Sequence, residues 1–188
     1  MKDKVASRDK LIPIFHQGED FKHLKRMLEY RHEDGSPIKY IGISPANDVM
    51  TQHKDRWFNQ VFGVIQNSSN PHVKTHAFGM TCKPQLEKYP FTSADSTSWL
   101  INARYGCLNF ENKTIVVSDR KTDDPLFYKN LSEDIEQRFE AKVIERGLDL
   151  EQMMTSSAYR CKWEALELID WLKNYKYKGR KKFQKRLF

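Results

Sequence analysis

Short apolar runs alternate with amphipathic helical patterns four times within the first hundred residues. The apolar runs are residues 11–15, 38–43, 73–78 and 91–94. Behind the first run, Asp20 is suited to an N-cap, and Phe21, Leu24 and Leu28 follow it at helical spacing. A second helical face is formed by Trp57, Val61 and Ile65, and a short helix is expected over 84–88. Strict alternation of strand and helix is typical of parallel α/β architecture.

The pattern changes after Trp99. Residues 105–110 and 114–118 flank a short polar turn and predict a β-hairpin. Apolar stripes over residues 132–146 and 157–175 predict two helices that pack against the rest of the protein. We therefore expect an α/β part over residues 1–104 and a C-terminal part over residues 105–188, made of the hairpin, the two helices and a basic end.

Polar residues or glycines cluster at the C-terminal end of each predicted strand. They are His16, Gln17 and Gly18; Gly42 and Ser44; His76 and Gly79; and Asp95, Ser96 and Thr97. Because the loops after parallel strands converge at one edge, this distribution favours a functional site there. Each residue taken alone also has a structural interpretation, since glycines close strands, Ser and Asp cap helices, and a histidine can be a hydrogen-bonded core residue.

Asp95 lies in the densest polar stretch of the chain, residues 93–99. A carboxylate at a strand end can attack an electrophilic sugar carbon or stabilise the charge of an oxocarbenium-like transition state. The hydroxyls of Ser96 and Thr97 could hold it in place. The same composition fits an Asx-type turn equally well. The chain lacks phosphate-loop and nucleophile-elbow motifs, and its three cysteines are dispersed, so no metal or cofactor is predicted.

The net charge of +7 is concentrated at the C-terminal end. Eight basic residues and no acidic residue lie between Lys173 and Phe188, and removing them leaves 24 basic and 25 acidic residues. Such a segment matches the phosphate-contacting part of nucleic-acid binding, although a solvated tail has the same composition. The candidate phosphate contacts are Lys176, Lys178, Arg180, Lys181, Lys182, Lys185 and Arg186.

Five segments taken in order resemble a known family. They are His-Gln-Gly-Glu-Asp at 16–20, Ile-Gly-Ile-Ser-Pro at 41–45, Lys-Thr-His-Ala-Phe-Gly-Met at 74–80, Tyr-Pro-Phe at 89–91 and Ser-Ala-Asp-Ser-Thr-Ser-Trp at 93–99. Together they resemble the latter half of the queuine tRNA-ribosyltransferase superfamily, in particular short phage and bacterial members related to 7-deazaguanine DNA transglycosylases. Those enzymes are TIM barrels that exchange a guanine in nucleic acid for a 7-deazaguanine.

The resemblance implies a partial TIM barrel that contains strands five to eight with their helices. It places Asp95 at the position of the nucleophilic aspartate after the eighth strand. The residues it implies around the exchanged base are His16, Gln17, Gly18, Gly42, Ile43, His76, Gly79, Ser96 and Thr97. The implied partners are DNA or tRNA and a 7-deazaguanine base, with no cofactor.

The chain also departs from the family. A complete barrel takes about 250 residues, and only four strand-helix units are present here. The first strand, with its second essential aspartate, and the family's Cys-x-Cys-x-x-Cys zinc motif have no counterpart in the sequence. Three interpretations stay open: one half of a split enzyme, a half-barrel that pairs with its own copy, and an inactive relative that binds nucleic acid or protein. An open flavodoxin-like sheet is a further alternative, but its phosphate loop is missing.

A second polypeptide or a second copy is expected to complete the barrel, because exposed strand edges are liabilities in water. No apolar run approaches the length of a membrane span, and the first residues lack a signal-peptide pattern. We expect no membrane partner and a cytoplasmic location in a bacterial cell, including the case of a phage-encoded protein.

Overall fold

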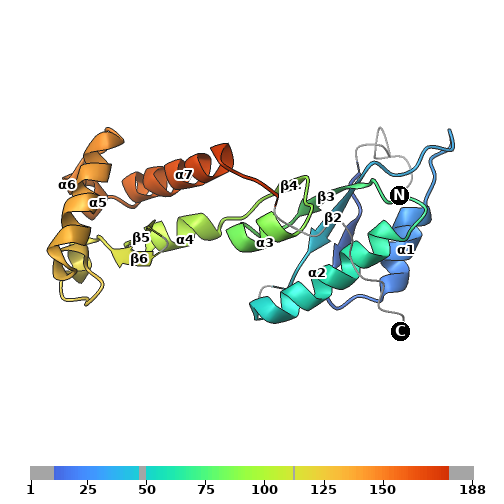
Figure 1. Ribbon diagram of the computed structural model, residues 1–188, viewed down its shortest axis with the longest axis horizontal. Helices are drawn as coiled ribbons and strands as arrows, with labels where there is room; N and C mark the ends of the chain where they lie inside the picture. Colours follow the sequence, from blue (N-terminus) through green and yellow to red (C-terminus); the bar gives the residue numbers. More distant parts are fainter. Residues whose placement is uncertain (1–10, 47–49, 112, 178–188) are drawn as a thin grey trace, which may run out of the picture. The chain divides into compact units, whose positions relative to one another are not determined.

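The computed structural model describes residues 11–46, 50–111 and 113–177, and the chain forms two compact units (Figure 1). The first unit contains the sheet up to Ser96, and the second spans Thr97–Tyr175. The division expected from the sequence places residues 98–104 in the first part. In the structure these residues form a helix that packs against the last helix of the second unit.

Strands and helices alternate in the first unit. The strands are β1 (Ile14–His16), β2 (Tyr40–Ser44), β3 (Lys74–Ala77) and β4 (Ser93–Ala94), and the helices are α1 (Phe21–Glu29), α2 (Thr51–Gln66) and α3 (Lys83–Lys88). The strands form one sheet in the order β1-β2-β3-β4, and every neighbouring pair is parallel. The predicted α/β architecture with four consecutive parallel strands is therefore confirmed.

Local chemistry explains where the helix α1 begins. The Asp20 carboxylate accepts a hydrogen bond from the Lys22 backbone N–H at 2.8 Å, as the sequence predicted for an N-cap. This hydrogen bond, with the ammonium group of Lys22 nearby, lowers the pKa of Asp20 below its usual value. In the loop after α2, the buried Asn70 amide donates at 2.7 Å to the carbonyl of Ile38, which precedes β2. This hydrogen bond holds the loop against the sheet.

The two faces of this sheet differ in character. Phe15 is fully buried and contacts Phe21 of α1 and Trp57 of α2, with ring centroids 5.3 and 5.8 Å away. Side chains alternate between the faces of a strand, so Ile41, Ile43 and Ala77, all fully buried, lie on this helix-covered face. The opposite face carries the alternate positions, which are Ile14 and His16; Tyr40, Gly42 and Ser44; Lys74 and His76; and Ser93. This mostly polar face is the one on which the candidate site lies.

The second unit combines a hairpin with helices. Its elements are α4 (Ser98–Arg104), β5 (Cys107–Phe110), β6 (Lys113–Val116), two 3₁₀ turns (Asp119–Lys121 and Tyr128–Asn130), α5 (Glu133–Glu145), α6 (Leu150–Thr155) and α7 (Ser157–Lys173). The strands β5 and β6 pair antiparallel. The predicted hairpin and the two long helices are confirmed, whereas α4 and α6 were not predicted. No helix within the described ranges is long and apolar enough to cross a membrane.

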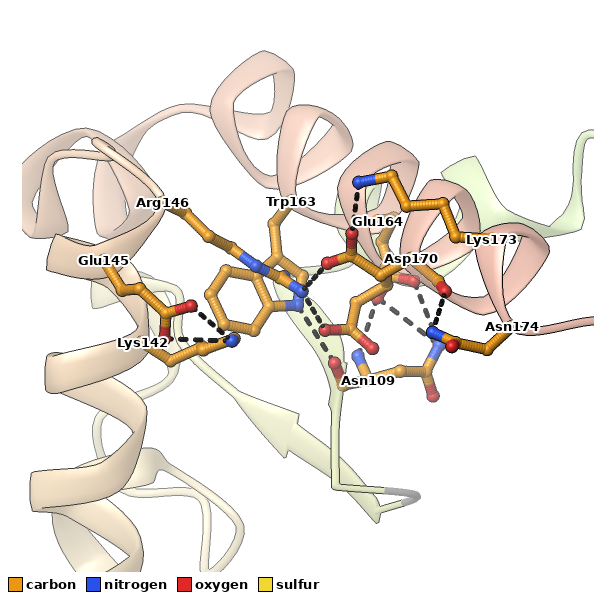
Figure 2. Close-up of polar contacts among 10 residues, drawn as sticks. Asn109, Lys142, Glu145, Arg146, Trp163, Glu164, Asp170, Lys173 and Asn174 are labelled. Atoms are coloured by element: carbon orange, nitrogen blue, oxygen red, sulfur yellow. Dashed lines mark hydrogen bonds and ion pairs between the residues drawn. The ribbon is translucent and has the colours of Figure 1, made fainter.

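Trp163 stands at the centre of the second unit's core and is fully buried (Figure 2). Its indole N–H donates to the Asn109 carbonyl at 3.0 Å, and the Arg146 guanidinium lies 4.3 Å from its ring centroid. Arg146 is paired with Glu167 at 2.7 Å and with Asp170 at 3.0 Å. These contacts join α5, α7 and the hairpin around one aromatic ring.

Candidate active site at the carboxyl ends of the strands

Asp95 directly follows β4 and is hydrogen-bonded to the end of β3 and to the segment that follows it. Its backbone N–H donates to the Ala77 carbonyl at 3.1 Å, and its own carbonyl accepts from the Met80 N–H at 2.7 Å. The peptide groups on both sides of Asp95 are therefore bonded to the segment that leaves β3. The side chain is 60% exposed. The structure thus presents a carboxylate at the carboxyl edge of the sheet, on a backbone held from two directions.

The Asp95 carboxylate is held through one oxygen. Oδ1 accepts a hydrogen bond from the Gly79 N–H at 2.9 Å, and the His76 Nε2 lies 3.5 Å from the same oxygen. Gly79 has φ of 62°, a left-handed conformation that glycine adopts at little cost and that turns its N–H toward Asp95. Among the described residues, no polar contact involves Oδ2. This is the oxygen that a substrate can approach.

His76 is the centre of a hydrogen-bonded cluster. Its Nδ1 lies 2.5 Å from the Ser93 hydroxyl, and the same hydroxyl lies 2.5 Å from the phenol oxygen of Tyr40. The ring of Phe78 packs edge-on against the imidazole, with centroids 4.4 Å apart. Only 18% of the His76 side chain is exposed. Side chains from β2, β3 and β4 thus meet at this ring.

Gly42 provides the space that the Phe78 ring needs. A Cβ atom at position 42 would lie 2.5 Å from the Phe78 Cε2 and 3.0 Å from the Ile14 Cγ1. A side chain is therefore excluded at position 42 while Phe78 keeps this position. The resemblance implies base contacts at both Gly42 and Ile43, but the Ile43 side chain is fully buried on the helix-covered face. Only the backbone of Ile43 can take part in the site.

The residues after β1 are joined to the end of β2. The Gln17 Oε1 accepts from the Ala46 N–H at 3.0 Å, and the Gln17 N–H donates to the Ser44 carbonyl at 2.9 Å. The His16 side chain is exposed, and the backbone N–H of His16 donates to the Glu19 carboxylate at 2.9 Å. Gly18, with φ of 102°, lies in the turn between His16 and Glu19. His16, Gln17 and Gly18 therefore lie at the same edge of the sheet as Asp95.

The remaining predicted residues lie elsewhere. Ser96 continues from Asp95, whereas Thr97 is the N-cap of α4 and begins the second unit. Its side chain makes no cap hydrogen bond. Lys176 is exposed after α7. The other basic residues predicted to contact phosphates, Lys178, Arg180, Lys181, Lys182, Lys185 and Arg186, lie outside the described residues.

Two members of the cluster, Tyr40 and Ser93, were not predicted from the sequence. Ser93 precedes Asp95 by two residues and Tyr40 precedes Gly42 by two, so strand alternation places both on the face that carries the site. The two-residue alternation of side chains along a strand is therefore the sequence signal that could have identified both residues. The pairing of Ser93 with His76 across β3 and β4 depends on the register of the two strands, which a single sequence does not reveal.

Metal binding has no candidate in the part of the chain that the structure describes. No group of three His, Cys, Asp or Glu side chains there is arranged to hold an ion. Cys82 is exposed, Cys107 and Cys161 are partly buried, and all three are free thiols.

Comparison of the chain with models of known protein families gives no match, and comparisons with curated proteins and with solved structures give none either.

Proposed function

We propose that the chain is part of a base-exchange transglycosylase that replaces guanine in DNA or tRNA with a 7-deazaguanine, with Asp95 as the nucleophile. The observation that carries this proposal is the state of the Asp95 carboxylate. It is exposed at the carboxyl edge of a parallel sheet, and its two polar contacts both involve Oδ1. A nucleophile needs this combination, because one oxygen must be oriented while the other reaches the substrate.

The reaction has two displacements. In the first, Oδ2 of Asp95 forms a bond to the anomeric carbon of the sugar as the bond from that carbon to guanine N9 breaks. The bonding electrons leave with guanine, which takes up a proton. In the second, the 7-deazaguanine loses the proton from the corresponding nitrogen and attacks the same carbon, which releases the Asp95 carboxylate. A covalent sugar ester thus divides one difficult exchange into two easier steps.

The site residues support this chemistry in distinct ways. The Gly79 N–H and His76 hold Oδ1, and they stabilise the carboxylate again each time the ester is broken. Gln17 and Gly18 follow β1, and Gly42 lies on β2, the strand between β1 and β3, on the side where the departing base would be bound. Lys176 and the basic residues beyond it would contact the phosphate backbone.

The barrel is the second part of the proposal. The strands follow one another in chain order, and α1 and α2 pack on the same face as Phe15, which supports a (β/α) barrel segment over a doubly wound sheet with helices on both faces. We assign β1 to β4 to strands five to eight. A second polypeptide or a second copy of the chain would then supply the other strands and the proton-transfer group.

An inactive nucleic-acid-binding or protein-binding module is the second candidate. It is favoured by the position of the Phe78 ring, which occupies the space over Gly42 where the resemblance implies contact with a base. In that case Asp95 would serve only the turn after β4.

Covalent trapping separates these candidates. The chain, together with any protein that co-purifies with it, is incubated with end-labelled DNA or tRNA and a 7-deazaguanine, and denaturing gels are examined for a chain carrying nucleic acid. Exchange is measured in parallel as incorporation of labelled guanine. The wild-type protein should form the adduct, and Asp95→Asn should lower exchange by on the order of 10⁴-fold while nucleic-acid binding is kept.

The matched control is Asp34→Asn. Asp34 also accepts a hydrogen bond from a backbone N–H, that of Ser36. Its substitution by Asn removes the same charge at a position outside the site. Its exchange rate should equal that of the wild type. If Asp95→Asn exchanges bases at the normal rate, Asp95 is a turn residue. If the wild type gives neither adduct nor exchange with either nucleic acid, the binding module is the better account.

A further inference from the structure

We infer that Tyr40 and Ser93 act as positioning residues that set the tautomer of His76, so that the Nε2–H of His76 faces the Asp95 carboxylate. The consequence for catalysis rests on the proposed function. The hydrogen-bond direction itself rests only on the contacts within the first unit, which makes the two parts separable by experiment.

The direction follows from the donors and acceptors available. An ionised carboxylate presents only negative charge and lone pairs, which favours a proton on the imidazole nitrogen that faces it. His76 presents Nε2 to Asp95 at 3.5 Å. In a neutral imidazole the other nitrogen, Nδ1, is then an acceptor. The Ser93 hydroxyl, 2.5 Å away, must donate to it.

The same reasoning extends one residue further. A hydroxyl that donates its proton to His76 can still accept through its lone pairs, and the Tyr40 phenol lies 2.5 Å from the Ser93 oxygen. Tyr40 therefore donates to Ser93. The hydrogen bonds run in a single direction, from Tyr40 through Ser93 to His76, and the Nε2–H of His76 then lies toward Asp95 at 3.5 Å. The Ser93 hydroxyl donates to His76 Nδ1 while Tyr40 donates to Ser93, and the proton of His76 is then on Nε2.

The geometry of the sheet makes this arrangement rigid. Ser93 is the register partner of His76 on the neighbouring strand, so the backbone brings the hydroxyl to Nδ1. The Phe78 ring packs edge-on against the imidazole and limits its rotation. Tyr40 reaches the cluster from β2, the strand on the other side of β3. Three strands thus fix one imidazole next to a carboxylate that is itself largely exposed.

The tautomer matters because of what the opposite one would do. With the proton on Nδ1, the lone pair of Nε2 would face the negatively charged Oδ1 and would repel it. Among the described residues, the Gly79 N–H would then be the one group left to hold the carboxylate, and Oδ2 would lose its orientation. Groups that orient a reacting residue from behind typically contribute about 10- to 100-fold to function.

Nitrogen-15 NMR of the imidazole rings tests the direction in the full chain, with the His76 signals assigned from the spectrum of His76→Gln. We expect the neutral ring of the wild type to carry its proton on Nε2. Ser93→Ala should give a mixture of both tautomers, and Tyr40→Phe a smaller change of the same kind. Ser44→Ala removes a hydroxyl from the same sheet face and should leave the ring unchanged. A proton on Nδ1 in the wild type, or an unchanged ring in Ser93→Ala, would overturn the inference.

Exchange kinetics test the catalytic part. Ser93→Ala should lower kcat by about 10- to 100-fold with KM unchanged, and Ser93→Thr, which keeps the hydroxyl, should recover most of the rate. A rise in KM alone would make Ser93 a substrate contact and refute the positioning role. If the tautomer changes as expected but no exchange is detected in the wild type, the proposed function fails and the hydrogen-bond direction stands.

Discussion

At the residue scale, the close packing of the Phe78 ring over Gly42 leaves no space for a Cβ atom at position 42. Gly42→Ala would place a methyl group 2.5 Å from the Phe78 ring and 3.0 Å from Ile14. We expect a loss of about 1–3 kcal/mol in the free energy of unfolding, because overpacking forces neighbours out of their rotamers. Urea unfolding followed by circular dichroism measures it. In Gly42→Ala/Phe78→Ala the clash is absent, so the two substitutions should be non-additive. Additive losses would show that Phe78 does not occupy this space.

Single residues of the site were predictable where one strand sufficed to place them. Asp95 and Gly79 directly follow apolar runs and His76 lies near the end of one, and the convergence of parallel strand ends brings them together. Ser93 and Tyr40 were not predictable, because their contacts cross between strands and depend on register. Thr97 was expected to support Asp95 and instead begins a helix of the second unit. Hydroxyls near a carboxylate in sequence do not determine which groups hold it.

Elements with a long pattern or a clear cap were predicted well. The second helical pattern corresponds to α2, the residue Asp20 caps α1, and the hairpin appears where the turn was expected. The helices α4 and α6 have only seven and six residues. Helices of that length are marginal by themselves and form through tertiary contacts, so the local sequence indicates some of them, such as α3, and misses others.

Arg160 supplies such contacts for both short helices. Its buried guanidinium donates to the Ala103 carbonyl at the end of α4 and to the Met153 and Met154 carbonyls at the end of α6, at 2.8, 2.8 and 2.9 Å. A cation here donates to carbonyls in the last turns of both helices, and the Ala103 carbonyl also accepts from the Gly106 N–H at 3.2 Å. The stabilising residue lies on α7, far along the chain from α4, and the helical patterns alone could not identify it.

Arg160→Lys keeps the charge but removes the planar group that reaches three carbonyls. We expect the free energy of unfolding to fall by about 2–4 kcal/mol, because buried acceptors lose their donor. Urea unfolding monitored by far-ultraviolet circular dichroism measures this loss. Arg138→Lys is the control, since Arg138 is half exposed and pairs with Glu111 and Asp134 at the surface. Equal stability of the two variants would contradict the role assigned to Arg160.

At the scale of the whole molecule, the sequence predicted the order and direction of the strands and left their closure open. Parallel strands in chain order are the simplest result of repeated right-handed crossovers, so alternation of the elements was enough to infer them. Closure requires knowing what pairs with the outer edges of β1 and β4. Those edges belong to the first unit, and no local pattern within the chain encodes their partner.

Association with a second chain is the property that our proposed half-barrel requires. In the described sheet, β1 and β4 each have one neighbouring strand, and Leu11 and Ile12, just before β1, are 57% and 46% exposed. Unpaired edges next to exposed apolar residues favour pairing with another chain. We expect light scattering at micromolar concentration to find a dimer or a stable complex with a second polypeptide. Leu11→Lys/Ile12→Lys should weaken this association, because charges at a strand edge oppose pairing. Ile144→Lys, at a 75% exposed position in the second unit, is the control and should leave it unchanged. A wild-type chain that stays monomeric and retains no partner would refute the half-barrel and leave the binding module as the function.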